Sequence, residues 1–177
     1  MEQSFKSSAI NYGLYLGGAL ALWTVLAYAV NLELLVNFWV NLLVLPLIII
    51  VFGVVSTAKS KGILNGFISF KNAFTSYFIT VLIGMLISSV VSIVLFNFID
   101  PDAAIQLKEI AIEKSITMME GFGAPADQVA QQLEILENTD FFSIGTQSAQ
   151  FFKGLIFFII IGLIVAAIMK KKNPDAQ

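Results

Sequence analysis

The residue types that most enzymes use for catalysis are scarce or missing in this chain. It has no cysteine, histidine or arginine, and its ten basic side chains are all lysines. Thiol nucleophiles, imidazole bases and Cys/His metal sites are therefore excluded. The stretch from Gly62 to Gly66 lacks the Lys-Ser/Thr pair of a phosphate-binding loop, and no Gly-x-Ser-x-Gly elbow occurs. We therefore expect no catalytic residue, cofactor or metal site, and a protein that is not an enzyme.

One pair of carboxylates has a spacing that could serve chemistry. Asp100 and Asp102 flank Pro101 and could contact a divalent cation, but no calcium-loop spacing follows them. Aspartate followed by proline is also typical of a helix start, with the aspartate as N-cap and the proline as first helical residue. The capping interpretation is favoured.

The composition is that of a membrane protein. Hydrophobic residues make up 58% of the 177 residues, 12% are charged, and the mean hydropathy is +0.86. Soluble domains are about 45–50% apolar and about 25% charged. The apolar residues lie in runs close to the roughly 20 residues that cross a bilayer as a helix. We predict an all-α fold, a single membrane domain over 1–177 that forms a four-helix bundle with spans at about 11–30, 38–58, 74–99 and 148–169.

Two of these runs allow more than one interpretation. Lys6 followed by an apolar run and Ala27-Tyr28-Ala29 is also typical of a signal peptide, but the run is long and its basic flank weak. Pro46 lies inside the second run, where we expect a kink, because proline removes one backbone hydrogen bond of a helix. A packing bend is favoured there over a gating hinge.

The lysines predict the orientation of the four spans. With four spans, both termini and the central connector lie on one side, which then holds Lys6, Lys59, Lys61, Lys71, Lys170, Lys171 and Lys172 against only Glu2 and Asp175. The other side holds the remaining three lysines and ten acids. Because short lysine-rich segments stay in the cytoplasm, we expect both termini to be cytoplasmic. Lys59, Lys61, Lys71, Lys170, Lys171 and Lys172 are the candidate contacts to lipid headgroups.

The connector from Lys59 to Phe74 has two interpretations. Phe67, Phe70 and Phe74 share one side of a nascent helix and could rest with the lysines on anionic lipid. Alternatively, the segment is a turn that re-enters the membrane with its aromatic residues at the interface. The turn is favoured because three lysines are few for lipid recognition.

Small residues at four-residue spacing mark candidate faces for helix packing. Such faces let two membrane helices approach closely, although they can also line a polar conduit. The packing interpretation is favoured, with the third span packed on the first. The candidate residues are Gly13, Gly17 and Ala21 in the first span and Ser76, Thr80, Gly84, Ser88 and Ser92 in the third.

The polar stretch 100–147 between spans three and four predicts an extracytoplasmic helical hairpin. Helices are expected at about Pro101–Glu120 and Pro125–Asn138, separated by Gly121-Phe122-Gly123. Apolar stripes would pack the two helices together: Ile112, Ile116 and Met119 against Val129, Leu133 and Leu136. From Asp100 to Gln150 the chain has nine acids and two lysines, a net charge of −7. That surface repels nucleic acid and suits a basic partner or divalent cations. Alternatively, the acids only keep the loop soluble, and this interpretation is slightly favoured over a dedicated site.

Several of these segments together resemble an uncharacterised family of small bacterial membrane proteins, the domain-of-unknown-function family 4199. The likeness lies in Asn11-Tyr12-Gly13-Leu14 with Gly17, in Gly66 to Phe74 (Gly-Phe-Ile-Ser-Phe-Lys-Asn-Ala-Phe), and in Phe98-Ile99-Asp100-Pro101. The four-span layout and the lysines after the last span fit as well. The resemblance implies the bacterial inner membrane and brings no activity with it.

Two classes of function are consistent with these patterns. The first is a non-enzymatic structural or partner-binding component, surrounded by membrane lipids, that contacts a protein partner or another copy of itself through the acidic hairpin. The alternative is a subunit of an oligomeric small-solute transporter or channel, supported by the Ser/Thr/Gly face of the third span. A stoichiometric partner in native membranes would favour the first, and a homo-oligomer alone the second.

Overall fold

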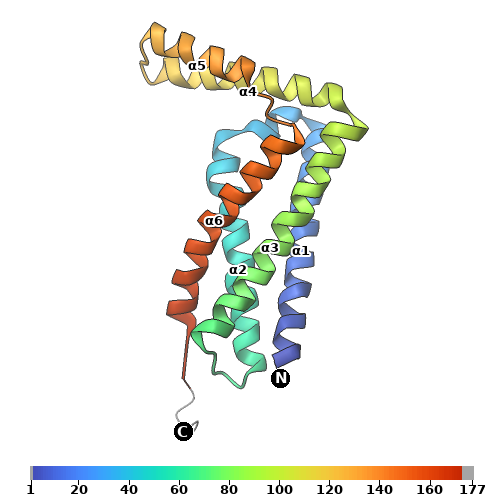
Figure 1. Cartoon of the computed structure of the whole chain (residues 1–177), viewed down its shortest axis with the longest axis vertical. Coiled ribbons are helices and arrows are strands. Elements are labelled where there is room, and N and C mark those ends of the chain that lie inside the picture. Colours follow the sequence, from blue (N-terminus) through green and yellow to red (C-terminus); the bar gives the residue numbers. More distant parts are fainter. Residues whose placement is uncertain (1, 173–177) are drawn as a thin grey trace.

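Four long apolar helices run the length of the molecule in the computed structural model, which describes residues 2–172 (Figure 1). Each is long and apolar enough to cross a membrane, over Ser4–Val30, Val40–Ile63, Phe70–Ile99 and Ile144–Met169. Apolar side chains such as Leu22, Leu47 and Ile156 face outward, where the acyl chains of lipids would cover them. The chain is a multi-pass membrane protein, and the predicted all-α membrane bundle is confirmed.

Short π turns complete two of the spans, and the rest of each span belongs to one of four α-helices. They are α1 (Glu2–Val30), α2 (Leu45–Ile63), α3 (Phe70–Val94) and α6 (Ile144–Met169). The expected spans began later for α1, α3 and α6 and ended earlier for α2, because polar residues also adopt helix where a cap is available. Ser69, for example, caps α3 by accepting a hydrogen bond from the Asn72 backbone N–H at 3.2 Å.

Short non-α turns join the spans at the end opposite the termini. A 3₁₀ turn, η1 (Leu32–Val36), leads from α1 to a π turn, η2 (Val40–Val44), and a second π turn, η3 (Leu95–Ile99), ends α3. Pro46 is the second residue of α2, directly after η2, so the expected distortion takes the form of a π turn before the proline. The helical path continues from η2 into α2, and a local π turn is one of the adjustments that accommodate a proline in a membrane helix.

The predicted hairpin is present and lies across that end of the bundle (Figure 1). It consists of α4 (Pro101–Gly121) and α5 (Ala126–Asn138). Asp100 caps α4 through a 3.0 Å hydrogen bond from the Ala103 backbone N–H to Oδ1, as predicted. Gly123 adopts a φ of 75°, a conformation that suits glycine and allows the sharp turn into α5.

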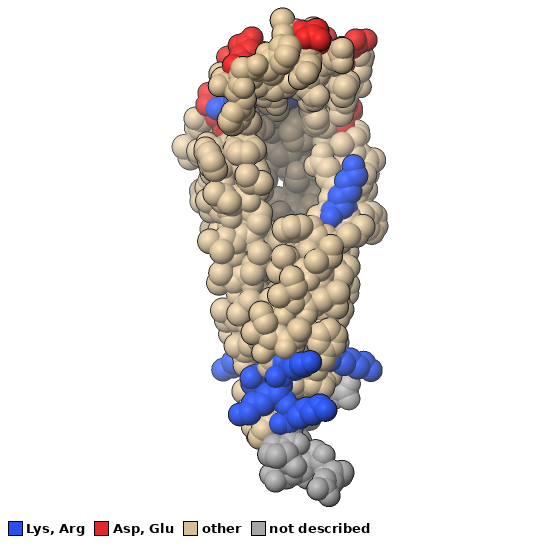
Figure 2. Space-filling view, turned by 90° about the vertical axis from the view of Figure 1, so that its left-hand side faces the viewer, with Lys and Arg blue, Asp and Glu red and all other residues tan. Residues whose placement is uncertain are grey.

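The two ends of the bundle differ in charge. Figure 2 shows lysines gathered around one end and acids around the other, with an almost uncharged surface between. We call these the lysine end, where α1 and α3 begin and α2 and α6 end, and the acidic end, which holds the α4–α5 hairpin. This division matches the pattern of charge expected from the sequence.

Candidate functional site

The α3 helix is the central element of the bundle, because it packs against α1, α2 and α6. Its small polar residues, spaced by four, therefore meet different neighbours along its length. Near the lysine end they are enclosed by other helices. Toward the acidic end they face a cavity.

A network of hydroxyl groups joins α2 and α3 near the lysine end. The Ser76 Oγ lies 2.7 Å from the Ser60 Oγ and 3.3 Å from the Ser56 Oγ. The Thr80 hydroxyl lies 2.7 Å from the Ser56 Oγ and 3.0 Å from the backbone carbonyl of Ala9, which links α1 to the same network. All four hydroxyl side chains are fully buried. A buried polar group costs free energy unless it has a partner, so this network holds three helices in one register.

Close backbone approaches reinforce the contact between α1 and α3. A Cβ atom added to Gly84 of α3 would lie 2.4 Å from a methyl carbon of Leu16. One added to Gly13 of α1 would lie 2.8 Å from Ile83 Cβ, and one added to Gly17 would lie 2.6 Å from Ile87. These glycines leave no room for a side chain, which is the arrangement that lets membrane helices pack tightly.

Tyr77 fills the space between α2 and α6 at the level of the hydroxyl network. Its side chain is buried, and a Cβ added to Gly53 of α2 or to Gly162 of α6 would lie 2.4 Å or 2.6 Å from its ring. The tyrosine hydroxyl has no hydrogen-bond partner among the described residues. The two glycines therefore let α2 and α6 close on the ring, and the lysine-end half of the bundle is packed throughout.

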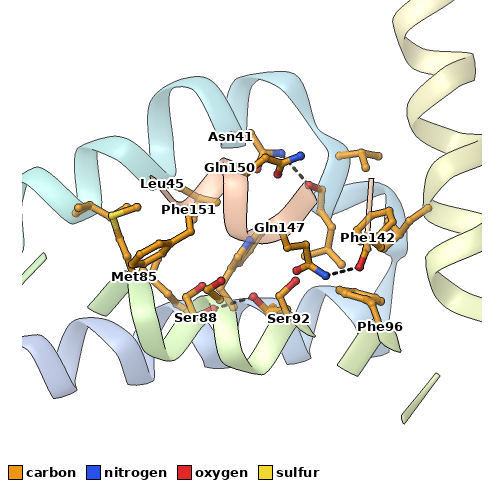
Figure 3. A pocket seen from close by; sticks show the side chains of 18 residues that line it. Asn41, Leu45, Met85, Ser88, Ser92, Phe96, Phe142, Gln147, Gln150 and Phe151 are labelled. Carbon is orange, nitrogen blue, oxygen red and sulfur yellow. Dashed lines mark hydrogen bonds between the residues drawn. The ribbon is translucent and has the colours of Figure 1, made fainter. Parts of the chain in front are cut away.

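A cavity of about 360 Å³ occupies the acidic-end half of the bundle. Figure 2 shows it as a hollow in the side of the molecule, below the acidic end, and Figure 3 shows its lining side chains. Its polar lining comes from α3 (Ser88, Ser89 and Ser92), from α1 and η2 (Thr24 and Asn41), and from α6 (Gln147 and Gln150). Its apolar lining includes Trp23, Met85, Phe96, Phe142 and Phe151. No lining residue is charged.

The amides of the cavity are only partly satisfied by the protein. The Gln147 side chain is 8% exposed, and its Nε2 donates a 2.7 Å hydrogen bond to the Phe142 carbonyl (Figure 3). Asn41 Nδ2 donates to the Leu35 and Asn37 carbonyls at 2.8 and 2.9 Å. Within residues 2–172, no hydrogen bond to the Gln147 side-chain oxygen or to the hydroxyls of Ser88, Ser89 and Ser92 is found. The cavity therefore offers free donors and acceptors without charge.

A carboxylate joins the acidic hairpin to the bundle just outside this cavity. The Tyr28 hydroxyl at the end of α1 donates a 2.7 Å hydrogen bond to Asp100 Oδ2. That bond and the backbone N–H of Ala103 stabilise the charged carboxylate and lower the pKa of Asp100 below its ordinary value. Asp102 is exposed. Among the described residues, no group of three or more acidic side chains is placed to hold a metal ion.

At the lysine end, the connector between α2 and α3 is tied to the residues after α6. Asn65 and Gly66 adopt φ angles of 58° and 83°, which turn the chain sharply. Ile68 and Lys171 exchange two backbone hydrogen bonds, of 3.0 and 2.9 Å. The Lys61 ammonium donates a 3.0 Å hydrogen bond to the Met169 carbonyl, at the C-terminal end of α6.

The remaining connector residues and the nearby lysines differ in how far they are exposed. The Lys171 ammonium lies 5.3 Å from the centre of the Phe67 ring. Ala73, near the start of α3, is fully buried, whereas Phe70 is exposed. Lys59, Lys71, Lys170 and Lys172 are exposed as well.

The structure divides the predicted packing residues between two surroundings. Gly13 and Gly17 meet α3, and Ala21 is half-buried. Gly84 meets α1 and Thr80 contacts both α1 and α2, but Ser76 contacts α2 instead of the expected α1. Ser88 and Ser92 line the cavity instead of a helix contact, because no side chain fills the space in front of them.

Sequence reasoning missed the partners of these residues. Ser56 and Ser60 have the same four-residue spacing in the second span, and that signal could have identified the network. Gln147 and Gln150 lie at the boundary assigned between the hairpin and the last span, so no pattern singled them out.

Among known proteins, one family model matches nearly the whole chain. No curated protein and no solved structure matches the chain. A family model matches residues 11–171, and its description is "Protein of unknown function (DUF4199)". The match covers the helices that form the network, the cavity and the hairpin. The chain therefore belongs to the DUF4199 family.

Proposed function

We propose that this chain is a non-enzymatic component of the bacterial inner membrane that binds a basic partner protein through its α4–α5 hairpin. The observation that carries the proposal is the exposure of α5. None of its residues is buried, although the helix stands at the end of a closely packed bundle. A helix of 13 residues is marginal by itself, so α5 depends on α4 and gains from a second contact.

The base of the hairpin is fixed firmly to the bundle. Ala103 and Leu107 of α4 are buried in a cluster with Leu95 and Phe96 of η3. Lys114 forms a 2.9 Å ion pair with Glu33 of η1. Because α4 is held in this way, it is a rigid support that presents α5 beyond the bundle.

The hairpin helices contact each other, and the stripes expected to join them are half-buried. These are Ile112, Ile116 and Met119 of α4, and Val129, Leu133 and Leu136 of α5. Ile105, nearer the start of α4, is 58% exposed. The outer face of α5 combines exposed Ile135 with the acids Glu134 and Glu137, and the tip presents Phe122.

The charge of this surface favours a basic partner over a second copy of the chain. Nine acids and two lysines between Asp100 and Gln150 leave a net charge of −7. Two such surfaces would repel each other, whereas a lysine- or arginine-rich segment would be attracted to them. Exposed Ile135 and Phe122 supply the apolar contacts that charge alone does not provide.

The orientation in the membrane is part of the proposal. The lysine end faces the cytoplasm and the acidic end the opposite side, because short lysine-rich segments are retained in the cytoplasm. Single cysteines at Lys59 and Gln131, both exposed, test this with an impermeant thiol reagent on intact cells. We expect labelling at Gln131 and protection at Lys59, and the reverse pattern would contradict the orientation.

The partner is tested with a photo-crosslinking residue at Ile135 in the full chain, in native membranes. We expect one adduct of defined mass that the triple variant D127N/E134Q/E137Q loses. The same residue at Leu22, on the apolar face of α1, is the matched control and should not give that adduct. An adduct of two copies of this chain, or one that persists after the three acids are neutralised, would contradict a basic partner.

A transporter or channel subunit is the second candidate, and the cavity is the observation that favours it. Polar groups line the cavity on several sides, as a solute path requires. The packed hydroxyl network and Tyr77 close the lysine-end half, so a path would have to form between copies. A homo-oligomer crosslinked through α3 or α6 in native membranes, with solute flux in liposomes, would support this candidate.

A further inference from the structure

We propose that the cavity binds an anionic glycerophospholipid, with an uncharged, hydroxyl-bearing headgroup inside it and the phosphate at Lys153 of α6. This inference concerns a different part of the molecule from the hairpin. It rests on three observations: where the cavity opens, which groups line it, and where Lys153 lies.

The cavity opens toward the lipid. It lies between η2 and α2 on one side and the first turns of α6 on the other, and Figure 2 shows its mouth in the uncharged side of the molecule. Its volume of about 360 Å³ is within the range of small-molecule sites in proteins. A lipid headgroup can enter such a mouth from the side while its acyl chains remain in the bilayer.

The lining suits a neutral polyol. Hydroxyls of Ser88, Ser89 and Ser92 come from one wall, and amides of Gln147 and Gln150 come from the facing helix (Figure 3). These groups can both donate and accept hydrogen bonds, as hydroxyl groups of a ligand require. The carbonyl oxygen of nearly buried Gln147 accepts no hydrogen bond from the described residues and is available to a ligand hydroxyl.

The absence of charge in the lining excludes other headgroups. A cationic headgroup would lie among uncharged side chains with no carboxylate to pair with it, and burying an unpaired charge is costly. A phosphate inside the cavity would have the same difficulty. The charged part of the ligand must therefore remain at the mouth.

Lys153 is placed to meet a phosphate at that mouth. It follows the cavity-lining residues Gln150 and Phe151 on the same helix, within one turn of both. The uninterrupted apolar run of α6 begins at the next residue, Gly154, so Lys153 lies at the depth where apolar core gives way to headgroups. The exposed lysine pairs with no carboxylate among residues 2–172. A lysine at this depth can extend its ammonium to the headgroup region, where it can meet a lipid phosphate.

The test measures lipid retention by the purified full-length protein with native mass spectrometry. Four lipids with identical acyl chains are compared: phosphatidylglycerol, phosphatidic acid, phosphatidylethanolamine and diacylglycerol. We expect one phosphatidylglycerol to be retained with an apparent Kd about tenfold or more below that of the others. Diacylglycerol lacks the phosphate for Lys153, phosphatidic acid lacks the hydroxyl-bearing group for the cavity, and phosphatidylethanolamine would place a charged amine among uncharged side chains.

Two variants separate the parts of the site. Lys153→Met should weaken phosphatidylglycerol binding by about tenfold and leave diacylglycerol unchanged. S88V/S92V should remove the preference for phosphatidylglycerol over phosphatidic acid, and Gln150→Leu provides the same test if the double variant does not fold. Lys59→Met removes a candidate headgroup contact at the other end of the bundle and measures the general contribution of one lysine, so it should weaken phosphatidylglycerol binding less than Lys153→Met does. Val90→Leu, on the outer face of α3, is the matched control and should bind as the unaltered chain does.

Equal retention of the four lipids would overturn the proposal, because it would show ordinary boundary lipid. Equal weakening by Lys153→Met and Lys59→Met would also overturn it, because it would show a general effect of charge. A preference for diacylglycerol would overturn it as well, because it would show a site for a neutral lipid with no phosphate at Lys153.

Discussion

The two halves of α3 use the same kind of residue with opposite results. Ser76 and Thr80, near the lysine end, are fully buried and bonded to α2 and α1. Ser88 and Ser92, about two to four turns closer to the acidic end, line a cavity. The spacing of four residues is identical throughout. The difference arises in what lies between the helices: Tyr77 of α3 fills the space between Gly53 of α2 and Gly162 of α6 in one half, and a cavity occupies the other half.

A stripe of small polar residues therefore identifies one face of a helix, but it does not determine whether that face packs against another helix or lines a cavity. Where neighbouring helices approach, the hydroxyls satisfy one another and the stripe holds helices together. Where a cavity lies between the helices, the same hydroxyls keep free hydrogen-bonding capacity and form the wall of a site. The packed half supplies the rigidity that positions the open half.

The largest effect is expected from breaking the packed half at Gly53. A Cβ there would lie 2.4 Å from Tyr77, and Gly162 prevents the ring from moving away. Gly53→Leu should therefore cost about 1–3 kcal/mol or more, as overpacking does, and folded yield in detergent should fall sharply. Gly62→Leu on the same helix is the matched control, because nothing lies within 4 Å of an added Cβ at that position. Equal yields for the two variants would contradict a packed lysine-end half.

A smaller effect is expected when one serine is removed from each half. Ser76→Ala leaves buried Ser56 and Ser60 with fewer partners, which should lower the free energy of unfolding by about 1–3 kcal/mol. Ser92→Ala removes a hydroxyl that faces the cavity, and its effect should stay within about 0.5 kcal/mol. Thermal unfolding in detergent, at matched lipid content, measures both. A larger loss of unfolding free energy in Ser92→Ala than in Ser76→Ala would contradict this difference between the two halves.

The hydrogen bond between Tyr28 and Asp100 predicts a modest dependence on pH at the acidic end. The bond lowers the pKa of the Asp100 carboxyl in the folded protein, so its stabilising effect is present above the unfolded-state pKa and is lost as the pH falls through the folded value. Tyr28→Phe removes the bond, raises the pKa of Asp100 toward its ordinary value, and moves the loss to higher pH.

Carbon-13 NMR titration of the Asp100 carboxyl measures this change directly. Tyr15→Phe is the control, since Tyr15 is an exposed residue of the same helix. An unchanged Asp100 pKa in Tyr28→Phe would show that, in solution, the hydrogen bond from Tyr28 does not stabilise the Asp100 carboxylate.

Local patterns predicted much of the fold. Apolar runs located the four spans, and Asp100-Pro101 and Gly123 marked the ends of α4, because caps and turns depend on a few neighbouring residues. The pairing of Ile68 with Lys171 and the bond from Ser76 to Ser60 join distant segments. They depend on how the helices assemble, which no local pattern specifies.

The cavity could not be predicted from the sequence for the same reason. Ser76 and Ser92 are the same residue type at equivalent positions of one periodic stripe, but Ser76 meets the buried serines of α2 and Ser92 meets a cavity. The sequence predicts a last span from residue 148, which leaves Gln147 in the hairpin. In the structure α6 begins at Ile144 and Gln147 lines the cavity.

The contrast between the two halves is tested most directly by thiol accessibility. The chain has no cysteine of its own, so Ser76→Cys and Ser92→Cys each introduce a single thiol with little change in size. In the folded protein we expect a small uncharged thiol reagent to label Ser92→Cys and to leave Ser76→Cys unmodified, while both react after denaturation in SDS. Equal labelling of the two folded variants, or labelling of Ser76→Cys alone, would contradict a packed lysine-end half beside an open acidic-end half.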